Sequence, residues 1–239
     1  MDPRESVIHH RLHQIKKILV VASGKGGVGK SLVASSLALS MKDQGKTVGL
    51  LDLDMYGPSA HVILGVNPDA FPKEDNGILP FGVQGMKFMS TVYFTKDKPA
   101  AFRGEDITNI MIELLAITRW DDLDVLIIDM PPGLGDEMLD VLRFIPEKEF
   151  LIVTTSSKVA YAAVKKLLLL LKELHEPIVG VIENMTKESN AFIRKQVQQE
   201  NIPYLGALAF DDTLEKSIGN PKKHRQTSFY QTLTVLQIH

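Results

Sequence analysis

The eight residues GKGGVGKS, from Gly24 to Ser31, combine four glycines with two lysines and a hydroxyl. Glycines let successive backbone N–H groups face one anion, and a helix that begins there adds the positive end of its dipole. The spacing predicts a loop around nucleotide phosphates, with Lys30 along the β and γ phosphates and the Ser31 hydroxyl on Mg²⁺. The residues expected to touch the nucleotide here are Gly24, Gly26, Gly27, Val28, Gly29, Lys30, Ser31 and Leu32.

Three aspartates follow apolar runs that read as buried strands. Asp52 and Asp54 lie in LLDLDMYGPS, and Asp129 ends VLIID. Because side chains alternate along an extended chain, Asp52 and Asp54 point to the same side, where one carboxylate can hold Mg²⁺ and the other can orient a water. Asp129 is typical of the aspartate that contacts Mg²⁺ through water in nucleotide hydrolases. The alternative is that strand-end carboxylates only cap turns.

Two further segments could respond to the nucleotide. Pro131, Pro132 and Gly133 follow Asp129, and two fixed prolines before a permissive glycine suit a switch that senses the γ phosphate. A plain tight turn is the alternative. The amide of Asn184, in VIENM, can donate and accept at once, as the N6 and N7 positions of adenine require. An exposed turn asparagine would explain that residue equally simply.

The elements that must position these residues alternate between short β-branched runs and longer helical patterns. This rhythm predicts an α/β fold with a parallel central sheet covered by helices on both faces, as in P-loop NTPases. The expected strands are 18–22, 47–52, 87–90, 125–129, 150–154, 178–182 and 204–207. The expected helices are 29–42, 105–118, 137–143, 160–174, 189–200 and 212–218.

Length and composition favour one domain over residues 1–239, with residues 1–17 as an N-terminal extension and 223–238 as a C-terminal helix. Residues 65–85 are expected to form a long surface loop. With 27 basic and 29 acidic residues, the chain gives no general reason to expect nucleic acid or a membrane as partner. The N-terminus lacks the apolar core of a signal peptide, so a cytoplasmic location is expected. No cysteine is present, which excludes disulfides and thiolate metal sites within this sequence.

Taken together, GKGGVGKS, LLDLDMYGPS, AFRGE, IIDMPPGLGD and VIENM resemble the Mrp/NBP35 branch of the MinD-type, deviant Walker A ATPases, from residue 18 to about 219. The resemblance implies a homodimer that binds ATP or ADP with Mg²⁺ and hydrolyses ATP. It implies that Lys25 reaches the partner's phosphates, that Asp54 orients the water and that Asp52 lies nearer the metal. Arg103, in AFRGE, would support the dimer or the switch, or be a plain surface arginine. The implied catalytic residues are Lys25, Lys30 and Asp54; the metal residues are Ser31, Asp52, Asp54 and Asp129; Pro132 and Asn184 complete the nucleotide site.

The absent cysteines bear on the role of such an ATPase. The Mrp/NBP35 branch usually carries iron–sulfur clusters on a C-x-x-C pair, and MTKESNAFIRKQ has none at the matching stretch. The chain therefore also resembles the archaeal HypB-type ATPases of nickel insertion during [NiFe]-hydrogenase maturation, and we expect that role. A HypA-like metallochaperone or the hydrogenase large subunit would then be its partner. His9, His10 and His13 could contact nickel, although a solvated helix explains them as well.

Three other functions remain as alternatives. An iron–sulfur cluster carrier or assembly ATPase is the first. A MinD-like positioning ATPase would use Phe229, Leu233 and Leu236 on an amphipathic C-terminal helix to bind a membrane, although this helix could dock on its own domain. A small-molecule kinase or synthetase would need a substrate pocket, which the loop at 65–85 could supply.

Overall fold

The computed structural model describes residues 2–95, 104–187, 191–236 and 238. In these residues one sheet of eight strands has the order β3-β4-β2-β5-β1-β6-β7-β8. All neighbouring strands are parallel except β3 and β4, which are antiparallel. The expected α/β fold is therefore confirmed. The strands are β1 (Ile18–Ser23), β2 (Val48–Asp52), β3 (Phe81–Val83), β4 (Met86–Ser90), β5 (Val125–Asp129), β6 (Lys148–Thr155), β7 (Ile178–Thr186) and β8 (Tyr204–Ala209).

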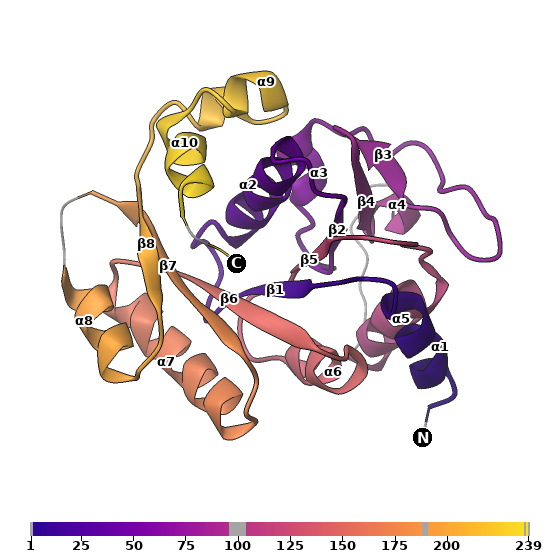
Figure 1. The fold of residues 1–239 in the computed structure, drawn as a ribbon, viewed down its shortest axis with the longest axis horizontal. Coiled ribbons are helices and arrows are strands. Elements are labelled where there is room, and N and C mark those ends of the chain that lie inside the picture. The colour runs from indigo at the N-terminus through magenta and orange to yellow at the C-terminus, as the bar shows by residue number, and fades with distance from the viewer. Residues whose placement is uncertain (1, 96–103, 188–190, 237, 239) are drawn as a thin grey trace.

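The central strands β1, β2 and β5 are buried along their whole length. A parallel sheet covered on both faces requires such continuous apolar runs, and the sequences ILVVA, VGLL and VLII supply them. Figure 1 shows α2, with α10 against it, on one face of the sheet, and α5, α6 and α7 on the other. The helices are α1 (Arg4–Leu12), α2 (Lys30–Asp43), α3 (Ala60–Leu64), α4 (Val92–Thr95), α5 (Gly104–Ile117), α6 (Asp136–Phe144), α7 (Lys158–Glu173), α8 (Ala191–Gln199), α9 (Pro221–His224) and α10 (Ser228–Thr234), with a short 3₁₀ helix η1 (Glu215–Ser217).

Three expected elements differ in the structure. The helix expected at 212–218 is reduced to the three residues of η1. The loop expected at 65–85 contains β3, which pairs with β4 as a hairpin. The C-terminal helix expected at 223–238 is two short helices, because the Thr227 side chain accepts a hydrogen bond from the Tyr230 backbone N–H and so starts α10 anew.

Both terminal segments pack on the body of the chain. Ile8 and Leu12 of α1 are buried and belong to the same hydrophobic core as the strands, and α1 packs on α5. Phe229 and Leu233 of α10 are buried, and α10 packs on α2 and β8. The apolar face that membrane binding would need is thus covered by the chain's own core. Among the described residues, no helix is both long and apolar enough to cross a bilayer.

Candidate nucleotide site

The glycine loop joins the end of β1 to the start of α2 and takes a shape that requires glycine. Gly27 and Gly29 have φ angles of 77° and 80°, in the left-handed region. A Cβ on Gly29 would lie closer than 3.0 Å to Asn184 Nδ2, and one on Gly24 would be as close to the backbone N of Val164 in α7. The loop therefore fits between α7 and the end of β7 because these positions have no side chain.

Sheet register brings the aspartates to this loop. Asp52 at the end of β2 is directly opposite Asp129 at the end of β5, and Asp129 is opposite Val21 of β1, three residues before the loop. Parallel strands end at one edge, which is where open α/β sheets bind their ligands. The register therefore brings Asp52 and Asp129 close to the loop.

Lys30 and Asp129 form a buried ion pair. Lys30 Nζ lies 2.5 Å from Asp129 Oδ1, and the two side chains are 6 % and 0 % exposed. The pKa of Asp129 lies above its ordinary value, because the effect of burial outweighs the opposite effects of the Lys30 ammonium and the Ser31 hydroxyl. Asp129 Oδ2 is buried without a hydrogen-bond partner among the described residues. A buried, unpartnered carboxylate oxygen at this place fits a Mg²⁺ shell, because Mg²⁺ and its waters prefer oxygen ligands.

Asp52 is bound more fully by the protein. Its Oδ1 accepts a hydrogen bond from the Asp54 backbone N–H at 3.1 Å, and its Oδ2 accepts one from Ala60 N–H at 3.2 Å. Burial, together with the nearby charge of Asp129, raises the pKa of Asp52 to about 8. The side chain thus ties β2 to the start of α3, and Asp129 is the freer ligand for a metal.

A cavity of about 370 Å³ opens beside the loop. Lys25 is exposed at this cavity, and Asp54 is half-buried with its Oδ1 accepting a hydrogen bond from Gly57 N–H at 3.0 Å. The predicted residues that line it are Lys25, Gly26, Gly27, Val28, Gly29, Lys30, Ser31, Leu32, Asp54 and Pro132. Gly24, Asp52, Asp129 and Asn184 lie outside this lining set.

Asn184 lies behind the loop rather than on an exposed turn. It is 2 % exposed, and its Nδ2 donates a hydrogen bond to the Val28 carbonyl at 2.9 Å. The turn alternative is therefore wrong, because the amide supports the loop. The reading of adenine by Asn184 stays a prediction, and in this arrangement Oδ1 is the atom left to make it.

The segment after β5 continues along the end of β1. Met130 N–H donates to the Val21 carbonyl at 3.2 Å, and Gly133 N–H donates to the Ser23 carbonyl at 2.9 Å. Gly133 has a φ of 96°, which favours glycine. These bonds place Pro132 against the loop; its ring is 3.8 Å from the position of a Cβ on Gly26.

Sequence reasoning missed the residues that close the cavity from other elements. Gly57, Ser59 and Ile63 come from the region around α3, and Ile218 follows η1. The YGPS segment gave a signal for Gly57 and Ser59. Nothing local marked Ile63 or Ile218. A long-range contact brings them together, because Gly219, the residue after Ile218, donates its N–H to the Ile63 carbonyl at 3.2 Å.

The histidines proposed as a nickel site do not form one. His9, His10 and His13 are exposed on and just after α1, and no group of three metal-binding side chains occurs among the described residues. Arg103 lies outside the described residues, so its role stays a prediction.

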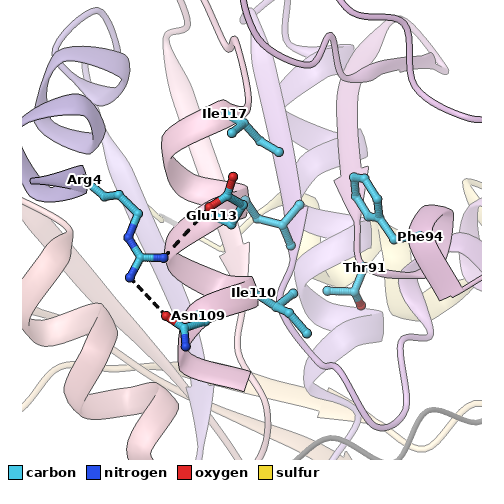
Figure 2. Close-up of a pocket in the computed structure, with 8 residues that line it drawn as sticks. Arg4, Thr91, Phe94, Asn109, Ile110, Glu113 and Ile117 are labelled. Carbon is cyan, nitrogen blue, oxygen red and sulfur yellow. Dashed lines mark hydrogen bonds and ion pairs between the residues drawn. The ribbon is translucent and has the colours of Figure 1, made fainter. Parts of the chain in front are cut away.

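A second cavity, of about 470 Å³, lies between α4 and α5. Figure 2 shows Phe94 and Ile110 at this cavity, with Arg4 hydrogen-bonded to Asn109 and ion-paired with Glu113 beside it. Its lining is mostly apolar and includes none of residues 65–85, so the substrate pocket expected from that loop is not found in this cavity.

Comparison with known proteins places this site in a family. A ParA model described as "NUBPL iron-transfer P-loop NTPase" matches residues 14–234. A Rickettsia felis protein named iron-sulfur cluster carrier protein is 39% identical over 212 residues, covering 87% of this chain and 66% of the relative. A Methanocaldococcus jannaschii protein of the same name is 39% identical over 187 residues, covering 77% of this chain and 64% of the relative. The chain thus spans less than two thirds of these relatives.

Solved structures of nucleotide-binding proteins have the same fold as this chain. The nucleotide-binding protein from Archaeoglobus fulgidus, in complex with ADP, is 28% identical with a TM-score of 0.82, covering 98% of this chain and 99% of that one. The cell division ATPase MinD of Pyrococcus furiosus covers 92% of this chain and 97% of its own, with a TM-score of 0.64. At 22% identity, MinD supports the fold alone.

These relatives overturn the expected role in nickel insertion. They are named iron-sulfur cluster carriers, so the HypB resemblance, the HypA-like metallochaperone and the hydrogenase large subunit find no support. The error came from treating absent cysteines as evidence for another metal, although the loop and strand-end motifs do not depend on cysteine. The chain belongs to the Mrp/NBP35-type branch of the ParA-family P-loop NTPases, the family described as iron-transfer NTPases.

Proposed function

We propose that this chain is a Mg²⁺-dependent ATPase that works as a homodimer in iron–sulfur cluster delivery. The observation that carries the ATPase proposal is the convergence of the glycine loop, Lys30, Asp54 and Asp129 at one sheet edge beside one cavity. The ADP-bound relative from Archaeoglobus fulgidus, which matches nearly the whole chain, supports the choice of an adenine nucleotide.

Each residue then has a chemical role. The loop backbone and Lys30 bind the phosphates, and for this Lys30 must exchange part of its contact with Asp129 for a phosphate oxygen. Ser31 and Asp129 would hold Mg²⁺, with Asp52 as a supporting carboxyl, and the metal would supply positive charge to neutralise the phosphates. Asp54, which faces the cavity, orients the attacking water.

Lys25 is the residue that makes dimerisation part of the mechanism. Lys30 and the loop already serve the phosphates of their own subunit, and Lys25 is exposed at the cavity. A cation supplied by a partner subunit can accelerate phosphoryl transfer by about 10³ to 10⁵. Hydrolysis would therefore follow ATP-driven pairing of two copies.

In this function an iron–sulfur cluster is cargo and not a cofactor held by these residues. Iron–sulfur clusters are held chiefly by cysteine thiolates, and these 239 residues contain none. The residues present do not fit a cluster of that kind. We therefore assign the nucleotide cycle to these residues and the thiolates to a position outside them, while the family's printed names support the iron–sulfur context.

Two measurements test the proposal. Phosphate release from MgATP should be measurable for the purified chain and should disappear when Mg²⁺ is chelated; hydrolysis that is insensitive to chelation would contradict the role of the metal. After anaerobic incubation with ferrous iron and sulfide, the desalted chain should lack the visible absorption of a cluster. Stable absorption with stoichiometric iron would show that other ligands hold one here.

A further inference from the structure

His224, the last residue of α9, bridges two elements from a buried position. Its side chain is 1 % exposed. Nε2 lies 2.7 Å from Ser36 Oγ of α2, and Nδ1 lies 3.2 Å from Ser217 Oγ of η1. The Tyr230 ring packs edge-on against the imidazole, with ring centroids 5.6 Å apart. One side chain thus joins the helix that starts at the glycine loop to the C-terminal segment.

Both ends of this bridge lead to the nucleotide cavity. Ser36 lies within the first two turns of α2, the helix that carries Lys30. Ser217 directly precedes Ile218, which lines the cavity. The backbone next to Ile218 is held on its other side by the bond from Gly219 to Ile63, another lining residue. His224 therefore connects α2 to the residue that precedes Ile218 in the cavity wall.

The hydrogen-bond pattern depends on the protons of the ring. Ser36 Oγ lies 2.6 Å from the Leu32 carbonyl, and Ser217 Oγ lies 2.7 Å from the Leu214 carbonyl. A serine that donates its one proton to a carbonyl can only accept from the ring. Neutral imidazole has one N–H, so one serine must instead turn its proton toward His224. Leu32 also lines the cavity, so the direction of the Ser36 hydroxyl bears on a residue of the site.

We propose that His224 is a positioning residue for nucleotide binding: by joining Ser36 to Ser217, it sets the place of the Ile218 wall relative to the glycine loop. This inference rests on the proposed nucleotide binding. It adds to that proposal a residue that does not touch the ligand and that belongs to the C-terminal segment.

The charge state of the ring gives the bridge a pH signature. Burial lowers the pKa of His224 from 6.5, the nearby Arg225 lowers it further, and Asp211 opposes both; Tyr230 is the titratable ring packed against it. Because the pKa of His224 is lower in the folded than in the unfolded chain, the ring is neutral in the folded protein at about pH 7.5. The free energy of unfolding should therefore fall as the pH drops below 6.5, until the pH reaches the folded pKa.

The test is ADP binding by calorimetry at about pH 7.5, where the ring is neutral. His224→Phe and Ser217→Ala should each weaken ADP binding roughly three- to tenfold, the size expected for one lost hydrogen bond. His224→Asn, which keeps a donor near Nδ1, should recover part of the loss. The fall in the free energy of unfolding that His224 causes at low pH should be absent in His224→Phe.

Tyr230→Phe is the matched control. It keeps the ring against His224 but removes the bond from Tyr230 Oη to Asp43 Oδ2, which is 2.6 Å long and lies at the far end of α2. It should lower stability and leave ADP affinity within about twofold. Equal loss of affinity in Tyr230→Phe, or unchanged affinity in folded Ser217→Ala and His224→Phe, would overturn the role of His224. If the wild type binds no ADP, the proposed function itself fails.

Discussion

At the scale of single residues, the site is governed by one buried ion pair. A buried pair stabilises little in itself, but removing one partner leaves an uncompensated charge in the interior. Lys30 and Asp129 are therefore coupled in stability, and the proposed function couples them in nucleotide binding as well. Lys25 differs, because it is exposed and can change without disturbing the core.

Lys30→Ala should abolish measurable ADP binding and lower the free energy of unfolding by roughly 3–5 kcal/mol, the range for breaking a buried pair. Urea unfolding and calorimetry measure the two effects. Adding Asp129→Asn should restore much of the stability, because it removes the stranded carboxylate, but none of the binding. A double variant no more stable than Lys30→Ala would show that the pair is not the cause.

Lys25→Ala should leave ADP affinity nearly unchanged and stability within roughly 0.5 kcal/mol of the wild type, as for other exposed positions. ATP hydrolysis should fall by about 10³ or more, because the cation supplied in trans is lost. Phosphate release at saturating ATP measures this. Wild-type turnover by the variant would remove Lys25 from the mechanism.

At the scale of elements, the loop and the C-terminal helix each depend on a close fit. Gly27 and Gly29 share a left-handed backbone, but only Gly29 lies against a side chain, Asn184. In α10, Leu233 is buried while Val235, just after the helix, is 74 % exposed. Each pair contrasts a packed position with an open one nearby.

Gly27→Ala should destabilise the protein by roughly 1–2 kcal/mol through backbone strain alone. Gly29→Ala should cost more, because the new methyl must also displace Asn184 from its bond to the Val28 carbonyl. Urea unfolding of both variants measures the difference. Combining Gly29→Ala with Asn184→Ala should reduce the additional loss of stability. Equal losses of stability for the two glycine variants would show that Asn184 moves aside without a measurable cost.

Leu233→Ala should lower the free energy of unfolding by roughly 2–5 kcal/mol, as expected for a buried leucine. Val235→Ala should change it by less than about 0.5 kcal/mol. Thermal and urea unfolding provide the measurement. Little effect of Leu233→Ala would mean that α10 contributes little to the fold and is available for another surface.

At the scale of the whole molecule, the proposal requires two copies of the chain. Asp54→Asn keeps an oxygen that can accept from Gly57 N–H but weakens the orientation of the water. With MgATP it should accumulate as an ATP-bound dimer, seen by analytical ultracentrifugation, and release little phosphate. The Lys25→Ala/Asp54→Asn double variant should remain monomeric in ATP. A single variant that turns over normally would place the water elsewhere.

The sequence by itself determined the fold class and most of the residues that gather at the glycine loop. The loop GKGGVGKS is contiguous, and Asp52, Asp54 and Asp129 each end an apolar run, so local spacing and the parallel sheet suffice to bring them to one edge. The sequence did not determine whether the role involves nickel or iron–sulfur clusters. The absence of cysteine shows which ligands are missing and says nothing about the metal that a partner handles.

Only the tertiary structure decided how the remaining parts fit. An amphipathic pattern such as that of Phe229 and Leu233 suits a membrane or a core equally, and packing on α2 settled it. The bond from Asn184 to the Val28 carbonyl ruled out an exposed turn for this residue and left its reading of adenine a prediction. His224 and Ile218 carry no local signal, because their roles arise from contacts between segments far apart in the chain. Such contacts depend on three-dimensional packing, which local residue spacing does not encode.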